Sequence, residues 1–180
     1  MDWKVEIKYD ENRKNPIIEV KPWGVLVILP LGFKEDIVDS LLKKHMNWIS
    51  KRYLELQEAL ERSHEIKLIE RDYNEFKRLV KKLVDEATEE VLGVNPCRIV
   101  IRKMKTRWAS YSKKGTLTIN YLAKYLPDHL LSYIIYHEVC HAIEPRHNER
   151  FWEYVKKKYP EYKELEKELL AYEIKLGLLR

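Results

Sequence analysis

The chain has 180 residues, of which 45% are apolar, 11% aromatic and 35% charged, with a formal net charge of +5. This composition provides enough apolar surface for a folded core, which excludes a disordered chain. No apolar stretch approaches the length of a membrane span, and the first residues lack the basic-then-apolar layout of a signal peptide, so we expect a soluble cytoplasmic protein with no membrane contact.

The first predicted elements are three short strands. Apolar and polar residues alternate in three segments, which favours extended structure, and the segments are 5–9, 17–21 and 25–29. The turn Pro22-Trp23-Gly24 separates the last two segments. Because the connections are short, the pattern predicts an antiparallel meander.

A long helix is predicted after these strands. Apolar residues recur at spacings of three and four from Glu35 to about Arg62, which is the period of a helix face. Trp48, Ile49 and Leu56 are expected on its buried seam. The sheet and the helix predict an N-terminal lobe over residues 1–70.

A second lobe is predicted over residues 71–180, and it begins with another helix. Asp72 and Glu75 have the spacing of a capping box, and Gly93 stands where this helix is expected to stop. Strands are then expected at 98–105 and 116–121, around the turn Lys113-Lys114-Gly115.

The helix expected after Pro127 carries the most informative motif of the chain, His137-Glu138-Val139-Cys140-His141. Residues four apart lie on one face of a helix, so His137 and His141 can offer two imidazoles to one ion. The carboxylate of Glu138 can reach a water in the open position of the metal, which is the location of a general base. The motif predicts a zinc hydrolase.

The third ligand has two candidates. Five residues separate His147 from His141, and Pro145 prevents simple continuation of the helix, so the chain must turn and can return His147 to the ion. The alternative is a carboxylate on a later helix, and the candidates are Glu161, Glu164 and Glu168. We favour His147 because neutral imidazole is a common zinc ligand.

Basic residues are concentrated in the second lobe. Residues 1–70 carry 12 Lys and Arg against 13 Asp and Glu, whereas residues 71–180 carry 22 against 16. The segment 93–127 has eight basic residues and no acidic one, interleaved with tyrosine and tryptophan. Such a surface favours single-stranded nucleic acid or an acidic peptide, and the alternative is a solvated basic face with the aromatic rings in the core.

Four segments resemble those of a known family, and they are 104–112, 117–120, 133–138 and 147–152. They are similar to the YgjP-like metallopeptidase family, relatives of the SprT and WLM zincins. Its pattern R-W-G-S-C-S reads Arg107-Trp108-Ala109-Ser110-Tyr111-Ser112 here, with two differences, and Arg146 replaces the Asn that usually precedes the last histidine. The resemblance implies an α+β fold, in which a small antiparallel sheet and a long helix precede a minimal zincin domain with the HExxH active-site helix.

The resemblance also implies zinc ligands at His137, His141 and His147 and a general base at Glu138. The expected reaction is metal-assisted hydrolysis of a polypeptide, which is held by strand addition to 116–121 as the edge strand. Acidic or nucleic-acid-associated polypeptides are the expected substrates.

A second function from another class is a nucleic-acid-binding protein with a structural zinc site and no peptidase activity. A structural site needs four protein ligands. Cys140 is the one available fourth ligand, and helix geometry directs it away from the histidine pair. Cys97 is expected to be a small buried residue, and two cysteines give no disulfide framework.

Overall fold

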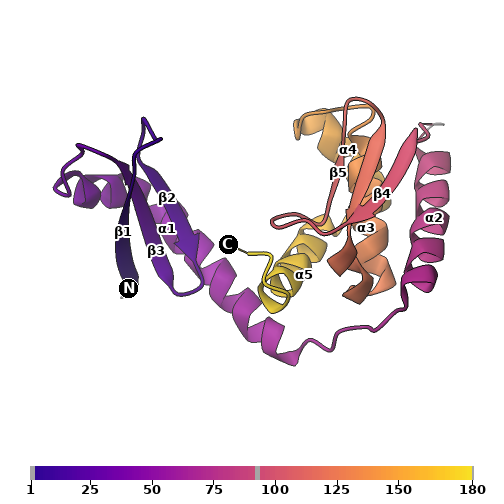
Figure 1. Cartoon of the computed structure of the whole chain (residues 1–180), viewed down its shortest axis with the longest axis horizontal. Coiled ribbons are helices and arrows are strands. Elements are labelled where there is room, and N and C mark those ends of the chain that lie inside the picture. Colours follow the sequence, from indigo (N-terminus) through magenta and orange to yellow (C-terminus); the bar gives the residue numbers. More distant parts are fainter. Residues whose placement is uncertain (1–2, 92–93, 180) are drawn as a thin grey trace. The chain divides into compact units, whose positions relative to one another are not determined.

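A computed structural model describes residues 3–91 and 94–179, which form two units, residues 3–64 and 65–179 (Figure 1). Together they contain two three-stranded sheets and five α-helices, which confirms the predicted α+β class. Among the described residues, no helix combines the length and the apolar character needed to cross a membrane. The division between the units falls at the end of the first helix, whereas the predicted boundary near residue 70 stays a prediction.

The first unit contains three strands and one helix, which are β1 (Lys4–Asp10), β2 (Ile17–Lys21), β3 (Gly24–Pro30) and α1 (Ile37–Glu65). The sheet order is β1-β3-β2, with β1 parallel and β2 antiparallel to β3, so the predicted meander is wrong. The nearly continuous apolar run of β3 is buried and takes the centre of the sheet. Burial therefore overrides the pairing of consecutive strands that short connections favour.

A glycine allows β1 to lie against β3. Gly24 has a φ of 150°, and a Cβ atom there would lie 2.2 Å from the carbonyl oxygen of Lys4. Helix α1 buries Ile49 and Leu56, but Trp48 is 50% exposed. Trp48 is next to Ile49 in sequence and so points about 100° away from the buried seam, which corrects the prediction for this residue.

The second unit contains five helices and three strands, which are α2 (Tyr73–Glu90), β4 (Arg98–Arg102), β5 (Ala109–Tyr111), β6 (Thr116–Asn120), the 3-10 helix η1 (Tyr121–Tyr125), α3 (Asp128–Cys140), α4 (Glu149–Lys158) and α5 (Tyr162–Lys175). The side chain of Asp72 accepts hydrogen bonds from the backbone N–H groups of Asn74 and Glu75, as expected of an N-cap. The predicted stop at Gly93 lies outside the described residues.

The sheet of the second unit has the order β4-β6-β5, with β4 parallel and β5 antiparallel to β6. The segment 116–121 was predicted to be the edge strand, and this is wrong because β6 is paired on both sides. The strand that forms the edge, β5, has only three residues. A segment this short is not recognisable from alternating apolar and polar residues.

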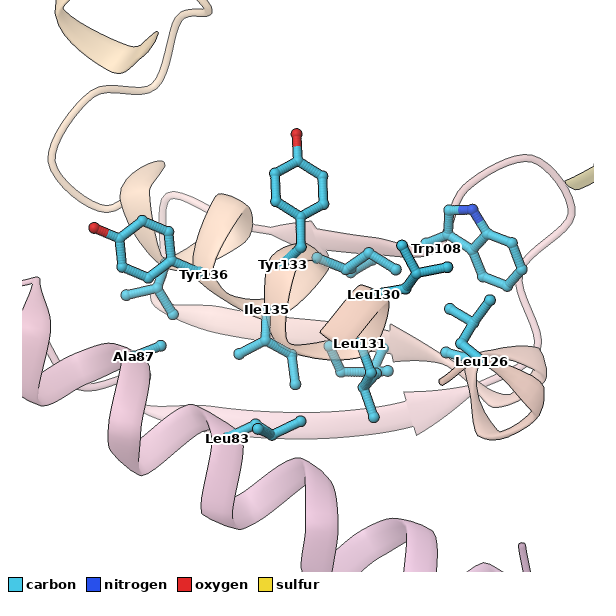
Figure 2. Close-up of a cluster of buried hydrophobic side chains, with 14 of the residues drawn as sticks. Leu83, Ala87, Trp108, Leu126, Leu130, Leu131, Tyr133, Ile135 and Tyr136 are labelled. Atoms are coloured by element: carbon cyan, nitrogen blue, oxygen red, sulfur yellow. The ribbon is translucent and has the colours of Figure 1, made fainter. Parts of the chain in front are cut away.

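Helix α3 lies in the main core. Figure 2 shows Leu131 and Ile135 on the side of α3 that faces Leu83 and Ala87 of α2, while Tyr133 points away from them. All five residues are buried. Because α3 is enclosed on most sides, the residues at its C-terminal end are held on a rigid support.

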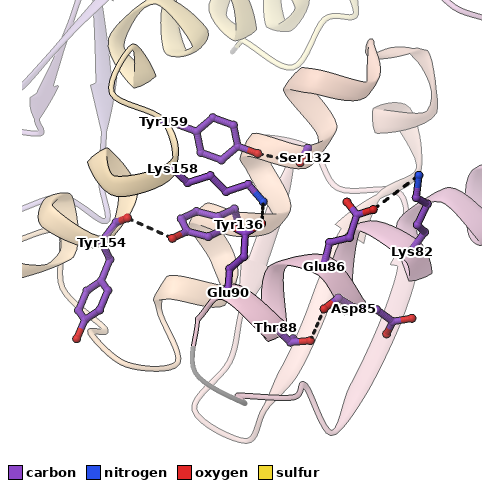
Figure 3. A network of polar contacts seen from close by, with 10 residues as sticks. All are labelled: Lys82, Asp85, Glu86, Thr88, Glu90, Ser132, Tyr136, Tyr154, Lys158 and Tyr159. Atoms are coloured by element: carbon purple, nitrogen blue, oxygen red, sulfur yellow. Dashed lines mark hydrogen bonds and ion pairs between the residues drawn. The ribbon is translucent and has the colours of Figure 1, made fainter.

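Polar contacts fix α4 beside α2 and α3 (Figure 3). The Lys158 ammonium donates to the Glu90 carboxylate at 2.6 Å, which joins α4 to the end of α2. The hydroxyls of Ser132 and Tyr159 lie 2.8 Å apart, and the Tyr136 hydroxyl donates to a backbone carbonyl of α4 at 3.3 Å. These contacts hold the middle and the C-terminal end of α4 against α2 and α3.

Candidate metal centre

The end of α3 and the start of α4 bring three histidines together. His137 lies in the last turn of α3, and His141 is its C-cap residue with φ −65° and ψ −15°, so the helical geometry extends to it. The chain then turns through Pro145, and Asn148 caps α4 by accepting a hydrogen bond from the Phe151 N–H. This turn returns His147 to the other two rings.

The three imidazoles converge through the same ring atom. The Nε2 atom of His147 lies 3.0 Å from Nε2 of His137 and 3.1 Å from Nε2 of His141. In the described ranges this is the one group of three or more His, Cys, Asp or Glu side chains that could hold a metal ion.

The alternative glutamate ligands do not belong to this group. The Glu168 carboxylate lies 3.0 Å from His129, and Glu164 pairs with Lys167 at 2.7 Å. Glu161 is an exposed residue at the N-terminus of α5. The arrangement therefore favours His147 over the carboxylates.

The donor set fits a zinc ion. Zinc binds imidazole nitrogen at about 2.0–2.1 Å, so three nitrogens of a tetrahedral site stand about 3.3–3.4 Å apart, close to the two Nε2 separations. The Nδ1 atom of His141 lies 3.1 Å from the backbone carbonyl of Glu144. Because a carbonyl only accepts, Nδ1 carries the hydrogen and leaves the Nε2 lone pair for an ion.

Burial and the neighbouring rings favour the neutral forms of His137 and His147. Burial, together with the neighbouring His141 and His147, lowers the pKa of His137 to about 3. Burial and His141 also lower the pKa of His147. A neutral imidazole is the form that binds a metal ion, and three such ligands leave a fourth position open.

Two aromatic residues of α4 support the histidines. The Phe151 ring is 0% exposed, and its centroid lies 4.8 Å from His137, 4.5 Å from His141 and 4.7 Å from His147. Trp152 stacks on His147, with centroids 5.8 Å apart. The contact of these two residues with the imidazoles was not predicted from the sequence. Phe151 follows His147 by four residues, a spacing that could have indicated a contact between these two rings.

Glu138 lies in a cleft of about 840 Å³, whose lining includes the three histidines, β5 and the turn that follows β5. Burial raises the pKa of Glu138 to about 7, while the backbone N–H of Tyr111 and the charge of Arg107 lower it. A carboxylate with this pKa accepts and releases a proton near neutral pH.

One side of β5 is open to the cleft. The backbone of Trp108 accepts from the Asn120 N–H at 2.7 Å, and the Ser112 N–H donates to Thr116 at 2.9 Å. In an antiparallel pair such hydrogen-bonded residues alternate with residues that face the other way. Ala109 and Tyr111 therefore direct their backbone groups away from β6, towards the free edge of the sheet.

Asn120 fixes the loop that leads into β5, and sequence reasoning missed this role. Its side-chain amide donates to the carbonyls of Met104 at 3.0 Å and Arg107 at 2.9 Å. Its side-chain oxygen accepts from the N–H groups of Met104 and Leu122. The side chain is buried, so these bonds hold Arg107 at the entrance to the cleft.

Three neighbouring histidines beside a partly buried carboxylate are the arrangement found in metal-dependent hydrolases. Residues 56–172 match the model of the YgjP-like metallopeptidase domain, which is more than half of the chain. The chain belongs to the YgjP-like family, as the sequence motifs predicted. A metallopeptidase family implies a catalytic metal, and the histidine group is the candidate to hold it.

Two solved structures are similar to part of this chain. The metallopeptidase zymogen abylysin of Pyrococcus abyssi is 28% identical, with a TM-score of 0.49, over 52% of this chain and 93% of that one. The metallopeptidase zymogen jannalysin of Methanocaldococcus jannaschii is 28% identical, with a TM-score of 0.47, over 52% of this chain and 95% of that one. No curated protein matches the chain.

Proposed function

We propose that this protein is a zinc-dependent peptidase in which His137, His141 and His147 hold the ion and Glu138 is the general base. The observation that carries the proposal is the convergence of three Nε2 atoms next to the partly buried carboxylate of Glu138. Zinc, when bound, would supply positive charge that polarises a substrate carbonyl and makes a water more acidic.

Glu138 moves the proton in this proposal. Its carboxylate accepts the proton of the attacking water and later returns it to the nitrogen of the departing amine. Without an ion, burial raises the pKa of this carboxyl to about 7, and the positive charge of a bound zinc ion would lower it. Membership of a metallopeptidase family is consistent with this role.

The open side of β5 is the proposed binding surface for an extended polypeptide. Ala109 offers a backbone N–H and a carbonyl, and Tyr111 offers a carbonyl, since its N–H is bonded to Glu138. Strand addition would pair these groups with substrate backbone and bring a peptide bond alongside Glu138. This proposal replaces the predicted addition to 116–121.

The ligand set weighs against a nucleic-acid-binding protein with structural zinc. A structural site requires four protein ligands, and the described residues that gather here number three. Cys140 was the available fourth ligand, but it is 0% exposed in the core and is not a member of the group.

The test is peptide hydrolysis by the zinc-loaded protein with a mixture of quenched fluorescent peptides. We expect hydrolysis that a chelator abolishes and added zinc restores. Glu138→Gln should lower kcat by about 10³-fold, because removal of a general base has effects of this order. Glu149→Gln, the same change at an exposed residue of α4, should retain activity. Hydrolysis that survives chelation would contradict the proposal.

A further inference from the structure

The cleft is lined by basic side chains on the side of β5. Arg107, Lys113 and Lys114 all contribute to its lining, and Glu138 is the single carboxylate among the described lining residues. All three basic residues are exposed. Apart from Glu138 and the three histidines, the charged residues that line the cleft are therefore all positive.

The two lysines are free to bind a ligand. Within the described ranges, neither Lys113 nor Lys114 makes an ion pair within 4.0 Å. Their charges are consequently not neutralised by the protein itself. An anionic group that reaches the cleft gains from both of them.

A tight turn holds the lysines in this position. The Gly115 N–H donates to the Ser112 carbonyl at 2.9 Å, and the Ser112 hydroxyl accepts from the Thr116 N–H at 3.0 Å. Gly115 has a φ of 75°, and a Cβ atom there would lie 2.9 Å from the Sγ atom of Cys97. The turn is thus fixed at both ends, and the lysines follow directly from β5.

The basic residues flank the open strand at both ends. Arg107 precedes β5 by two residues, and Lys113 and Lys114 follow it by two and three. An extended peptide advances about 3.3 Å per residue, as β5 does. Residues of a strand-added peptide on either side of the bond beside Glu138 would therefore come within reach of a basic side chain.

We propose that the substrates of this protein are acidic polypeptide segments, with Asp or Glu on both sides of the bond that is cleaved. Arg107, Lys113 and Lys114 determine this specificity. The inference rests on the proposed peptidase function, because that function places the cleaved peptide bond alongside Glu138. Opposite charge across a binding surface favours selection among partners more than raw affinity.

Nucleic acid is also negatively charged, but it is a less favoured ligand of this cleft than an acidic polypeptide. Binding of single strands relies on exposed aromatic rings on which bases stack. Trp108 is 6% exposed, so its ring is not available for stacking. The ammonium of Lys124 lies 4.8 Å from the Tyr121 ring centre and 4.7 Å from that of Tyr125. Trp108, Tyr121 and Tyr125 are thus occupied within the protein, which leaves Tyr111 as the aromatic residue of the basic segment that lines the cleft.

The experiment measures binding to the zinc-loaded Glu138→Gln protein, which should not cleave its ligand. Two fluorescent peptides of equal length are compared, one with Asp and Glu around the central bond and one with Asn and Gln. We expect the acidic peptide to bind about 10-fold more tightly at low salt, with the difference shrinking as salt rises. A single-stranded DNA oligonucleotide is measured in parallel.

Charge variants identify the residues responsible. Adding Lys113→Glu and Lys114→Glu should remove the preference, while Lys113→Arg with Lys114→Arg should keep it. The matched control is Lys43→Glu with Lys44→Glu, an adjacent exposed pair on α1, which should bind like the protein without charge changes. Zinc content and circular dichroism check that each variant retains its fold.

Two results of the binding experiment would overturn the inference. One is equal binding of the acidic and the neutral peptide at low salt. The other is tighter binding of the oligonucleotide than of the acidic peptide, lost on reversal of Lys113 and Lys114. Cleavage by the parent protein without acidic preference would refute the inference alone, whereas acid-selective binding without cleavage would refute the peptidase function alone.

Discussion

His141 and its neighbours illustrate how single residues prepare the metal centre. The Glu144 carbonyl fixes the tautomer of His141, and burial keeps His137 neutral. Both effects make the Nε2 lone pairs available before an ion arrives. His147 is the exposed member of the group, and its position depends on the turn and on the ring of Phe151.

The first prediction concerns the third ligand. His147→Ala should lower the zinc affinity by at least about 100-fold, because it removes one of three nitrogen donors. Competition with a chromophoric chelator measures this affinity. The control is Glu168→Gln, which alters the carboxylate that pairs with His129 and should leave zinc binding unchanged. Full zinc affinity in His147→Ala, with loss on substitution of Glu161, Glu164 or Glu168, would overturn the assignment.

Phe151 should contribute to both stability and metal binding. Phe151→Ala leaves a cavity under three imidazoles, so the free energy of unfolding should fall by about 3–5 kcal/mol. Zinc affinity should fall as well, since the rings lose their common support. Phe151→Leu fills most of the cavity and should show smaller losses of both quantities. Urea unfolding and chelator competition measure them, and a variant that loses stability with unchanged zinc affinity would refute the supporting role.

At the scale of elements, Asp72 gives α2 a stability that depends on pH. Hydrogen bonds from the backbone of Glu75 and Asn74 lower the pKa of its carboxyl group. Because the pKa of Asp72 is lower in the folded state, its carboxylate stabilises the fold at pH values above the ordinary carboxyl pKa. This stabilisation is lost as the pH falls through the pKa of Asp72 in the folded state. Asp72→Asn keeps a capping side chain without a charge.

We therefore expect the parent protein to be more stable than Asp72→Asn at pH 7, and the difference to shrink as the pH falls below the ordinary carboxyl value of 3.8. Asp72→Ala should be the least stable of the three at neutral pH. Urea unfolding at neutral and at acidic pH checks this. A difference between parent and Asp72→Asn that is independent of pH would show that the charge plays no part.

The existence of most elements could be predicted from the sequence, whereas the pairing of strands could not. Periodic apolar residues indicated α1, α2 and α3, and Pro145 indicated the turn that brings His147 back. The order of each sheet depends on which strand is most completely buried, and this is a property of the whole core. β5 itself was missed because three residues are too few for a periodic pattern.

The candidate site was predictable to a similar extent. The spacing of His137, Glu138 and His141 on a helix predicted their proximity, because helix geometry is local. The contacts of Asn120 and Phe151 were not predictable, since they join segments whose relative position depends on tertiary packing. The resemblance to the YgjP-like family supplied the motif but not these contacts.

At the scale of the whole molecule, every residue of the candidate site lies in the second unit. Its core is the larger of the two hydrophobic clusters and contains residues of α2, α3, α4 and α5. We predict that a chain of residues 65–180 folds alone and binds zinc with the stoichiometry of the full protein. Circular dichroism and metal analysis test this. An unfolded shortened chain would show that the first unit is required for folding.

The central claim is that three histidines hold zinc while Glu138 acts on the reaction without holding the ion. The most direct test measures zinc content and peptide hydrolysis together in the parent protein and in Glu138→Gln. We predict one zinc ion per chain in both proteins and hydrolysis in the parent alone. Loss of zinc from Glu138→Gln, or hydrolysis by that variant at the parental rate, would contradict the account.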